Sequence, residues 1–450
     1  MVKTMKKQTA IMVSKTLNKL SRKMGHDGST IGGYWALKID KNIIRKIKMP
    51  KYVIGITGSS GKSSTTALVA KILKNAGFSV AYNTNGSNAI NGITSLLTDN
   101  SDINGNFKKD VLLMELDEKY SQYILKHFSP THFVISNLSR DQATRNVSPD
   151  WLVEQINTVI NDDVHLILNA DDPVLERITR EHNGKVTYFG MDKNEYSVKK
   201  TILENLDANY CPKCESKLKY DFYHYGHIGS YYCTECGYER PKPKYEATDI
   251  NLEDRSFKVG NTTLSIRSDF LYLVYTNLTA YSLCMELGVD EDVIINTITE
   301  EANKKELDVY NFNGRPWRLL LSKNENNLSY KQSLEYINHH KGLKTVIIGF
   351  DNVSRRYHES DISWIYDIEF ETLDDNSIDK ILLIGKFKYD LLTRLDYAGI
   401  DTKKVILVDE LDDLKDAVRE HTKGDIYSVA YFDMVATLRN MLKGGEDDED

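Results

Sequence analysis

The segment 55–65 has the residues of a phosphate-binding loop. It is Gly-Ile-Thr-Gly-Ser-Ser-Gly-Lys-Ser-Ser-Thr, and it lies between the apolar run KYVIGIT and the helix-like stretch TTALVAKILKNAG. In such a loop, glycines let backbone N–H groups point at phosphate oxygens, and the helix N-terminus adds its positive dipole end. Lys62 supplies a charge for the terminal phosphates, and Ser63 is placed to ligate Mg²⁺. The strict G-x-x-x-x-G-K-[ST] spacing fails at Ile56, but the flanking strand and helix argue against the alternative, a Gly/Ser turn with an incidental lysine.

Carboxylates downstream of this loop bear on the metal ion. Glu115 and Asp117 end the run DVLLMELDE, where a strand delivers a carboxylate beside the loop, and that geometry suits Mg²⁺. The segment Asn-Ala-Asp-Asp-Pro at 169–173 closes the next apolar run, and ligands bind at the C-terminal edge of such a sheet. The alternatives are surface carboxylates in a turn for the first pair and a helix start for the Asp-Asp-Pro segment.

Four of the five cysteines have the spacing of a zinc ribbon. Cys211 and Cys214 form one C-x-x-C pair, Cys233 and Cys236 form the other, and eighteen residues separate the pairs. This spacing is a metal pattern of reducing compartments rather than a disulfide framework. Four thiolates around Zn²⁺ leave no position for a substrate, so we expect a structural site, with free thiols as the alternative. Cys284 lies in an apolar helical stretch, where a buried and unreactive thiol is expected.

The elements that must position these groups follow from alternating apolar runs and helical stretches. From residue 50 the strand-like runs are KYVIGIT, SVAYN, DVLLMEL, HFVIS, VHLILN and KVTYF, a pattern typical of a mostly parallel sheet covered by helices. A later series, KTVIIGF, KILLIGKF, KVILVDE and DIYSVAYF, indicates a smaller, Rossmann-like doubly wound α/β domain. The predicted organisation is a basic arm at 1–49, a central ATP-binding domain at 50–310 with a cysteine insertion at 205–245, a C-terminal α/β domain at 311–445 and an acidic tail at 446–450.

Composition and charge exclude several classes of protein. The 450 residues are 41% hydrophobic and 27% charged, which is globular composition, and a formal net charge of −7 argues against nucleic acid as a partner. Residues 1–49 carry twelve Lys or Arg against two Asp. This arm is interpreted as a solvated helix, or alternatively as a contact for an anionic lipid surface or a phosphorylated substrate. Without a membrane-spanning run or a secretory segment, a cytoplasmic protein is expected, at the inner face of the cell membrane if the arm binds lipid.

Taken together, these motifs resemble the Mur ligase superfamily, the ATP-dependent amide-forming enzymes of cell-wall and folylpolyglutamate synthesis. Residues 57–65 match its shortened phosphate loop T-G-x-x-G-K-[ST]-[ST]-T, residues 137–142 resemble its N-[IL]-x-x-D-H element, and residues 169–173 its N-A-D-D-P. Tyr275-Thr276-Asn277 and Gly314-Arg315 fall where the superfamily has its Y-N-x-x-A helix and a phosphate-facing arginine. The histidine that often ligates a second metal is Gln142 here, so a second Mg²⁺ site is in question.

Three further features are similar to the MurT subfamily, the synthetase subunits of lipid II isoglutaminyl synthase. They are the substrate-side loop at 84–88 with Asn-Gly-Ile at 91–93, the four-cysteine insertion, and Asp-Ile-Ser-Trp-Ile-Tyr-Asp at 361–367 followed by Leu-Asp-Tyr-Ala-Gly at 395–399. Two segments depart from the subfamily: its G-R-x-E is Gly-Arg-Pro-Trp at 314–317, and its K-N-P-x-G is Lys-Asn-Glu-Asn-Asn at 323–327.

The resemblance implies a reaction and a set of residues. The reaction is amidation of the α-carboxylate of D-glutamate in the lipid II stem peptide to D-isoglutamine, through an acyl phosphate formed with ATP and Mg²⁺. The implied catalytic residues are Lys62, Glu115 and Asp361, with Ser63 and Glu115 as Mg²⁺ ligands. The implied nucleotide contacts are Thr57, Gly58, Ser59, Ser60, Gly61, Lys62, Ser63, Ser64, Asn137, Asn169, Asp171, Asn277 and Arg315.

The amine for this reaction needs a source outside the chain. Ammonia is scarce at neutral pH, so such enzymes release it from glutamine with an activated cysteine, and this chain has none to spare. The subfamily's partner, a GatD-type glutamine amidotransferase subunit, fits that gap. The resemblance gives Asp361 the role of orienting the partner's histidine, with Asp367 as the second candidate. The alternative is that Asp361 only caps the turn that carries Ser363 and Trp364.

Two competing functions stay open at this point. Another Mur-type ligase would add an amino acid to folate or to a UDP-MurNAc-linked peptide; the cysteine insertion and the D-x-S-W segment speak against it. A nucleic-acid-binding NTPase would use the ribbon and the basic arm as contacts, and the overall acidity speaks against that.

Overall fold

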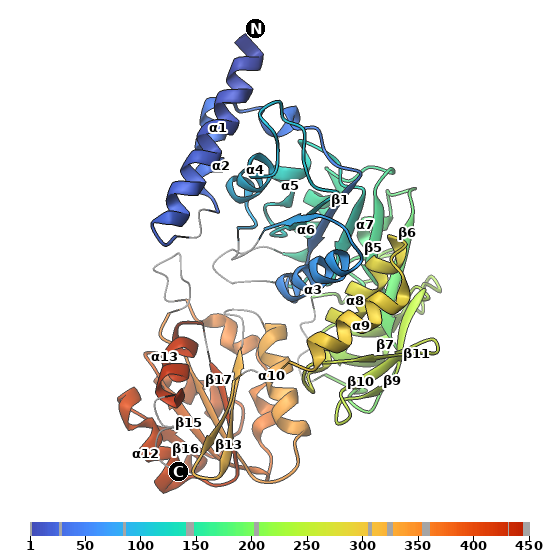
Figure 1. The fold of residues 1–450 in the computed structure, drawn as a ribbon. Coiled ribbons are helices and arrows are strands. Elements are labelled where there is room, and N and C mark those ends of the chain that lie inside the picture. The colour runs from blue at the N-terminus through green and yellow to red at the C-terminus, as the bar shows by residue number, and fades with distance from the viewer. Residues whose placement is uncertain are drawn as a thin grey trace.

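The protein is described by a computed structural model that covers residues 2–26, 29–83, 87–140, 148–201, 207–304, 308–321, 327–352, 361–430 and 432–443. Two α/β domains follow one another along the chain, and a pair of N-terminal helices lies against the first (Figure 1). Among the helices in these ranges, none combines the length and the apolar character needed to cross a membrane.

The central domain is built on a nine-stranded sheet with the order β11-β10-β9-β6-β5-β4-β1-β3-β2. Its strands are β1 (Tyr52–Thr57), β2 (Val80–Tyr82), β3 (Val111–Glu115), β4 (His132–Ile135), β5 (His165–Asn169), β6 (Val186–Met191), β9 (Tyr245–Asn251), β10 (Ser256–Val259) and β11 (Thr262–Ser265). Strands β1 to β6 and β9 are parallel, whereas β10 and β11 extend the edge in antiparallel fashion. The predicted parallel sheet is therefore confirmed, and β9 to β11 are an extension that the sequence pattern did not predict.

Helices cover both faces of this sheet, because successive side chains of a buried strand point to opposite faces. Ile54 and Ile56 of β1 share one core with three helices, and Val53 belongs to a second core on the other face. The helices of the first core are α3 (Lys62–Asn75), α8 (Leu271–Glu286) and α9 (Glu291–Ala302). Those of the second are α1 (Val2–Lys23), α2 (Ile31–Ile39), α4 (Ile90–Asp99), α5 (Ser121–Leu125), α6 (Pro149–Asn157) and α7 (Glu176–Thr179).

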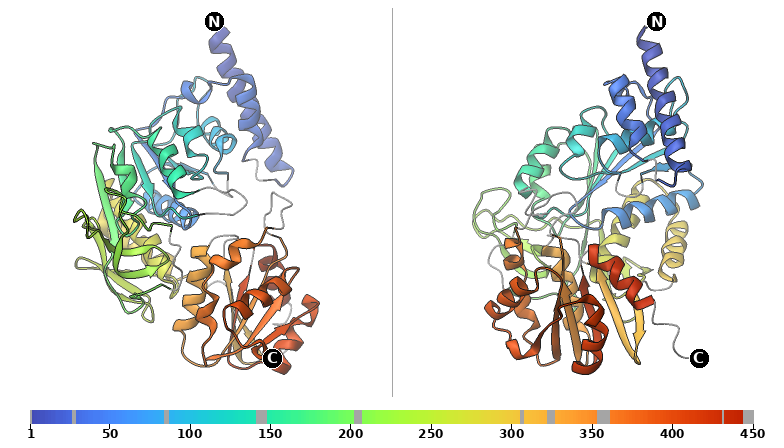
Figure 2. Two further views of the ribbon diagram at one scale, coloured as in Figure 1. Left: turned by 180° about the vertical axis from the view of Figure 1, so that it is seen from behind. Right: turned by 90° about the vertical axis from the view of Figure 1, so that its left-hand side faces the viewer.

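Small side chains hold the two N-terminal helices on the domain. The backbone N–H of Gly32 in α2 donates to Asn18 Oδ1 of α1 at 2.9 Å, and a Cβ added to Gly33 would lie 1.9 Å from the carbonyl oxygen of Asn91 in α4. Figure 2 shows α1 along the edge of the central domain, with its N-terminus pointing away from the C-terminal domain. The close helix packing buries Ala10, Ile11 and Ala36, whereas Met5, Met12 and Trp35 stay exposed.

The cysteine segment lies between β6 and β9 and forms a hairpin of β7 (Lys219–Tyr225) and β8 (Ile228–Tyr232) that joins neither large sheet. Leu218 and Tyr231 pack with two of the cysteines in a small core of their own. We call residues 207–243 the ribbon.

The C-terminal domain has a six-stranded sheet with the order β12-β13-β17-β14-β15-β16. Its strands are β12 (Val309–Phe312), β13 (Arg315–Leu321), β14 (Lys344–Gly349), β15 (Ile378–Ile384), β16 (Val405–Leu407) and β17 (Asp425–Ala430), and its helices are α10 (Asn327–His339), α11 (Lys388–Tyr397), α12 (Leu414–His421) and α13 (Phe432–Lys443). All pairs are parallel except the β12–β13 hairpin at one edge. The predicted series of four strands is confirmed, whereas the β12–β13 hairpin, with Pro316 inside it, was not predicted.

The two domains meet where α10 lies beside the start of α8. The rings of Phe270 and Tyr336 stack with their centroids 4.1 Å apart, and Asp269 lies 3.2 Å from the His340 ring nitrogen. Thr201 of the central domain donates to Glu369. Aromatic stacking and polar pairs thus both join the domains.

Candidate functional site

The phosphate loop connects β1 directly to α3, which begins at Lys62. Gly58 has a φ of 147° and Gly61 a φ of 81°, backbone values that favour glycine. A Cβ at Gly58 would also lie 2.2 Å from Ser136 Oγ, so this position excludes side chains twice over. Ser63 and Ser64 in the first turn of α3 are exposed, and their hydroxyl groups are open to a ligand at the helix N-terminus.

The loop is held by the segment that follows β4. Asn137 accepts the Ser59 N–H on its carbonyl oxygen at 2.9 Å and the Ser60 N–H on its side-chain Oδ1 at 3.0 Å. Ser59 Oγ donates to the Ser139 carbonyl oxygen at 3.1 Å and accepts the Ser139 N–H at 2.9 Å. The structure therefore brings Asn137 next to residues 57–64, as the motifs indicate. Its side-chain and backbone oxygen atoms hold the loop through hydrogen bonds.

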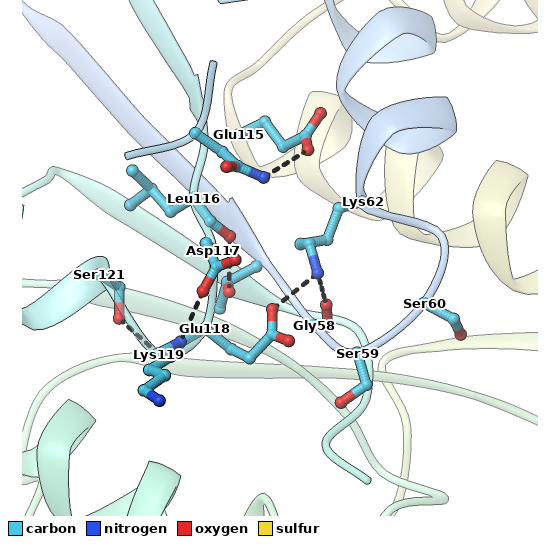
Figure 3. Close-up of polar contacts among 12 residues, drawn as sticks. Gly58, Ser59, Ser60, Lys62, Glu115, Leu116, Asp117, Glu118, Lys119 and Ser121 are labelled. Atoms are coloured by element: carbon cyan, nitrogen blue, oxygen red, sulfur yellow. Dashed lines mark hydrogen bonds and ion pairs between the residues drawn. The ribbon is translucent and has the colours of Figure 1, made fainter. Parts of the chain in front are cut away.

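Lys62 has a carboxylate partner that the sequence analysis missed. Its Nζ lies 2.7 Å from Glu118 Oε2 and also donates to the Gly58 carbonyl oxygen (Figure 3). Both charged side chains are buried, with 10% and 4% of their surfaces exposed. Burial strengthens this ion pair, because little water screens it. Glu118 stands three residues after Glu115 in the same acidic run, and the sequence does not show which of these carboxylates turns toward Lys62.

Glu115 ends β3 directly beside β1, where it pairs in register with Ile56. Asn83 fixes its backbone through two hydrogen bonds of 2.8 and 2.9 Å, and Asn88 donates to its carboxylate at 3.3 Å. Glu115, Asp117 and Glu118 are all buried. Their carboxylates contact separate neighbours (Figure 3). The sequence motifs assign Mg²⁺ to Glu115 and Ser63, whose oxygen atoms are the kind of ligand that this ion prefers.

Asp171 bonds to other side chains and backbone within the central domain, although the motif makes it a nucleotide contact. Its carboxylate is fully buried and accepts from Arg240 Nε at 2.5 Å, the Tyr275 hydroxyl at 2.6 Å and the Met191 N–H at 2.8 Å. Three donors already satisfy its oxygen atoms, so Asp171 anchors β6, α8 and the ribbon to one another. The other two predicted contacts bond locally: Asn169 accepts the Asp171 N–H at 3.0 Å, and Asn277 donates to the Ser265 carbonyl oxygen at 2.7 Å.

Arg315, which the motif makes a phosphate contact, bonds to groups within the C-terminal domain in this structure. It begins β13, at the end of the parallel sheet opposite the strands' carboxyl ends. Its guanidinium donates to the carbonyl oxygens of Gly424 at 2.5 Å and Thr422 at 3.2 Å, and to the Thr345 hydroxyl at 3.2 Å. Those bonds tie the loop before β17 to the sheet. The motif specifies an arginine at this position, and the register of β13 decides which groups its side chain contacts.

The four ribbon cysteines come together as predicted. Their four sulfur atoms all lie within 4.8 Å of one another. Such a group of thiols fits a Cys₄ zinc site. Hydrogen bonds from Ser216 lower the pKa of the Cys214 thiol to about 6, which favours the thiolate that a metal requires. Burial raises the pKa of Cys284, and its thiol is fully buried, in keeping with an unreactive side chain.

Asp361 stands just before the 3₁₀ turn Ser363–Asp367. It accepts the Ser363 N–H at 2.9 Å, and hydrogen bonds from Ser363 lower the pKa of its carboxyl group. Its side chain is exposed, whereas Asp367 lies 3.8 Å from Arg140 of the central domain. Asp361 therefore caps the turn and still presents a charged carboxylate at the surface. Residues 84–86, 141 and 142, and 323–326 of the other motifs lie outside the described residues.

Comparisons with known proteins agree with this architecture. Residues 56–220 match the family model of the Mur ligase middle domain, and residues 321–434 match that of the MurT ligase C-terminal domain. Among solved structures, a pseudomurein peptide ligase type C from Methanothermus fervidus superimposes with a TM-score of 0.67, at 24% identity over 90% of this chain and 81% of that one. This likeness concerns the fold.

Two curated relatives extend over most of the chain. The lipid II isoglutaminyl synthase (glutamine-hydrolyzing) subunit MurT of Streptococcus pneumoniae is 27% identical over 428 residues, 92% of each chain. The subunit of the same name from Staphylococcus aureus is 30% identical over 414 residues, which are 89% of this chain and 90% of that one. With phosphate loop, cysteine group and both domains in place, the chain belongs to the MurT family of lipid II isoglutaminyl synthase subunits, which are ligases of the Mur type.

Proposed function

We propose that the protein activates the α-carboxylate of D-glutamate in the lipid II stem peptide with ATP and converts it to the amide of D-isoglutamine. A carboxylate oxygen attacks the γ-phosphorus and ADP leaves; ammonia then attacks the acyl carbon, phosphate leaves, and the nitrogen loses a proton. The observation that carries this proposal is the loop at 58–64, where Lys62 begins α3 and pairs with the buried Glu118.

Each part of that site has a task in phosphoryl transfer. The loop N–H groups and the N-terminus of α3 bind the phosphates, and Lys62 neutralises charge as it develops on the transferred group. Ser63 and Glu115 are the proposed ligands of Mg²⁺, which supplies further charge neutralisation when bound. No side chain has to act as a nucleophile, because positioning and electrostatics provide most of the catalysis.

Ammonia would come from a GatD-type glutaminase subunit. Within the part of the chain that the structure describes, four cysteines form the zinc-type group and the fifth is buried in α8, so none is placed to hydrolyse glutamine. Asp361 is exposed and charged at the surface of the C-terminal domain. There it would orient the partner's histidine and stabilise its protonated form.

A comparison of nitrogen sources tests both roles in the reconstituted complex. Lys62→Ala is expected to abolish amidation with glutamine and with ammonium, whereas Lys71→Ala, on the same helix but paired with Glu300 at 2.9 Å, retains it. Asp361→Asn keeps an oxygen that caps Ser363 but removes the charge. It is expected to lose more than about 100-fold with glutamine and nothing with ammonium. Turnover by Lys62→Ala would refute the loop's role. Equal losses of the glutamine-dependent and ammonium-dependent activities in Asp361→Asn would refute the role of Asp361 toward the partner.

The arm provides a contact for the membrane that holds a lipid-linked substrate. Helix α1 has no acidic residue, and the arm exposes large apolar side chains: Met5, Met12, Leu20, Met24, Ile31, Tyr34 and Trp35. Basic charge together with inserted apolar side chains supplies the two signals that stable attachment to anionic lipid needs.

Vesicle sedimentation tests this contact. The full chain is expected to bind phosphatidylglycerol vesicles and not phosphatidylcholine vesicles. Replacing Met5, Met12 and Trp35 together by Ser is expected to reduce the bound fraction several-fold. Replacing Tyr389 and Tyr397 of the C-terminal domain by Ser, both of which are more than half exposed, is expected to leave the bound fraction unchanged. Equal binding by the two variants would exclude the arm as the contact.

A further inference from the structure

The ribbon is tied to two adjacent buried aspartates of the central domain. Arg240, which follows the second cysteine pair, reaches Asp171 at 2.5 Å. His227, in the tight turn between β7 and β8, places Nε2 3.2 Å from Asp172 Oδ1. Both carboxylates are fully buried, and so is His227. Asp171 also accepts the Gly229 N–H of β8 on its carbonyl oxygen at 2.9 Å. The ribbon is therefore fixed to the Asp-Asp-Pro segment from both sides.

Asp172 continues this connection toward the phosphate loop. Its other oxygen, Oδ2, accepts the backbone N–H of Leu138 at 2.8 Å. Leu138 follows Asn137, whose carbonyl and side-chain oxygens accept the N–H groups of Ser59 and Ser60. One carboxylate and one backbone segment thus separate the turn of the ribbon from the loop that would bind nucleotide.

The electrostatics explain why the ribbon matters to this segment. Burying a carboxylate without a countercharge is strongly unfavourable, and the chain buries two in succession. Arg240 serves Asp171, and His227 serves Asp172. Burial acts to lower the pKa of His227, but the nearby Asp172 carboxylate, helped by Asp207, raises it overall. The hydrogen bonds to the Asp172 carboxylate come from the backbone N–H groups of Leu138 and Val174, so His227 contributes a nearby positive charge. Without that charge, the hold of Asp172 on Leu138 would weaken.

We propose that the ribbon is a positioning device for the nucleotide site: His227, acting through Asp172 and the Leu138 backbone, holds the phosphate loop in its binding conformation. His227 is a positioning residue, since Asp172 and the backbone of residues 137 and 138 lie between it and the phosphate loop. This inference rests on the proposed nucleotide-binding function of the loop and gives the four-cysteine ribbon a role within it. Nucleotide affinity then depends on a side chain that never contacts nucleotide.

Calorimetry with MgADP on the purified full chain tests the proposal. His227→Gln removes the charge and is expected to weaken MgADP binding about tenfold, or about 1.4 kcal/mol. The matched control is His224→Gln in the same hairpin. His224 is equally buried, but it contacts Ser197 Oγ at 3.2 Å and the Met191 carbonyl oxygen at 3.3 Å. This control is expected to change MgADP affinity less than twofold.

Hydrogen exchange separates this role from a loss of general stability. The Leu138 amide, the donor to Asp172, is expected to exchange faster in His227→Gln and to keep its wild-type rate in His224→Gln. In turnover, the KM for ATP is expected to rise while kcat stays near the wild-type value. Unchanged MgADP affinity together with unchanged Leu138 exchange in His227→Gln would overturn the proposal.

A second measurement covers a variant that fails to fold. Metal removed from the wild-type chain with a chelator, and verified by metal analysis, is expected to lower MgADP affinity in parallel with the loss of metal, while circular dichroism reports the intact α/β domains. Affinity that persists without metal would overturn the coupling. A wild-type chain that never binds MgADP would refute the proposed function itself, a result distinct from either of these.

Discussion

At the scale of single residues, the ion pair of Lys62 with Glu118 sets the electrostatics of the loop. The same ammonium group is the one that would contact nucleotide phosphates, so phosphate and Glu118 compete for it. A buried carboxylate this close to an anion site opposes a metal-free anion and is relieved when a divalent cation arrives. We therefore expect the loop to bind a nucleotide with its metal more tightly than the metal-free nucleotide.

Neutralising Glu118 tests this competition. Glu118→Gln is expected to bind metal-free ADP about five- to tenfold more tightly than the wild type, a change of about 1 to 1.4 kcal/mol, because one negative charge no longer competes for Lys62. Titration in magnesium-free buffer measures it. The control is Asp110→Asn, which changes the same net charge at the exposed start of the β3 segment, where Asp110 bonds Ser79. Equal effects of both variants would point to net charge instead of the ion pair.

Sequence motifs predicted the position of the loop, but not the side-chain orientation of every residue near it. Residues 57–64 and Asn137 were predictable because glycine spacing and chain order fix the turn. Asp171 and Arg315 match motif positions, but the motif does not give the direction of their side chains. Arg240 and Tyr275 orient Asp171, and the register of β13 orients Arg315. Neither arrangement has a local sequence pattern. Glu118 was hidden among neighbouring acids, since a run of carboxylates does not show which one turns toward a lysine.

At the scale of elements, the N-terminal helices bury small and polar side chains beside a few apolar ones. Apolar side chains at helical spacing normally predict a buried stripe, yet Met5, Met12 and Leu20 face outward while Ser14 and Asn18 are fully buried. Glycines in α2 permit this, because they let the backbones of α1 and α4 approach closely. Charge pattern predicted a basic arm, but only the packed structure shows which of its faces is exposed.

A methyl group at this contact tests how tightly the helices pack. Gly33→Ala places a Cβ 1.9 Å from the Asn91 carbonyl oxygen, and backbone has to move to relieve that overlap. The free energy of unfolding is expected to fall by about 2 kcal/mol or more, measured by urea denaturation. Met5→Ala, on the exposed face of α1, is expected to change it by less than about 0.5 kcal/mol. A Gly33→Ala chain of wild-type stability would show that α2 is loosely attached.

At the scale of the whole molecule, the domain contact encloses a titratable group. A cavity of about 210 Å³ lies between α10 and the start of α8, lined by Phe270, Tyr272, Gln332 and Glu335 among others. The sequence predicted two α/β domains because each has its own series of apolar runs. Their contact was not predictable, because it uses single residues scattered over α8, α10 and the ribbon hairpin.

The pH dependence of stability should report on this contact. Burial raises the pKa of Glu335 to about 8, above the usual value near 4.5. The folded chain then keeps a proton that the unfolded chain has already lost, so the contribution is complete below about pH 4.5 and is lost as pH rises toward 8, at up to about 1.4 kcal/mol per pH unit. Urea midpoints of the wild type should therefore fall between pH 6 and 8 more steeply than those of Glu335→Gln, which has no proton to lose.

Glu301→Gln is the control, because the pKa of Glu301 is lowered and its carboxyl group stays ionised throughout this range. Parallel pH profiles for the wild type and Glu335→Gln would mean that Glu335 is already charged in the folded protein, and that the domain contact accommodates that charge.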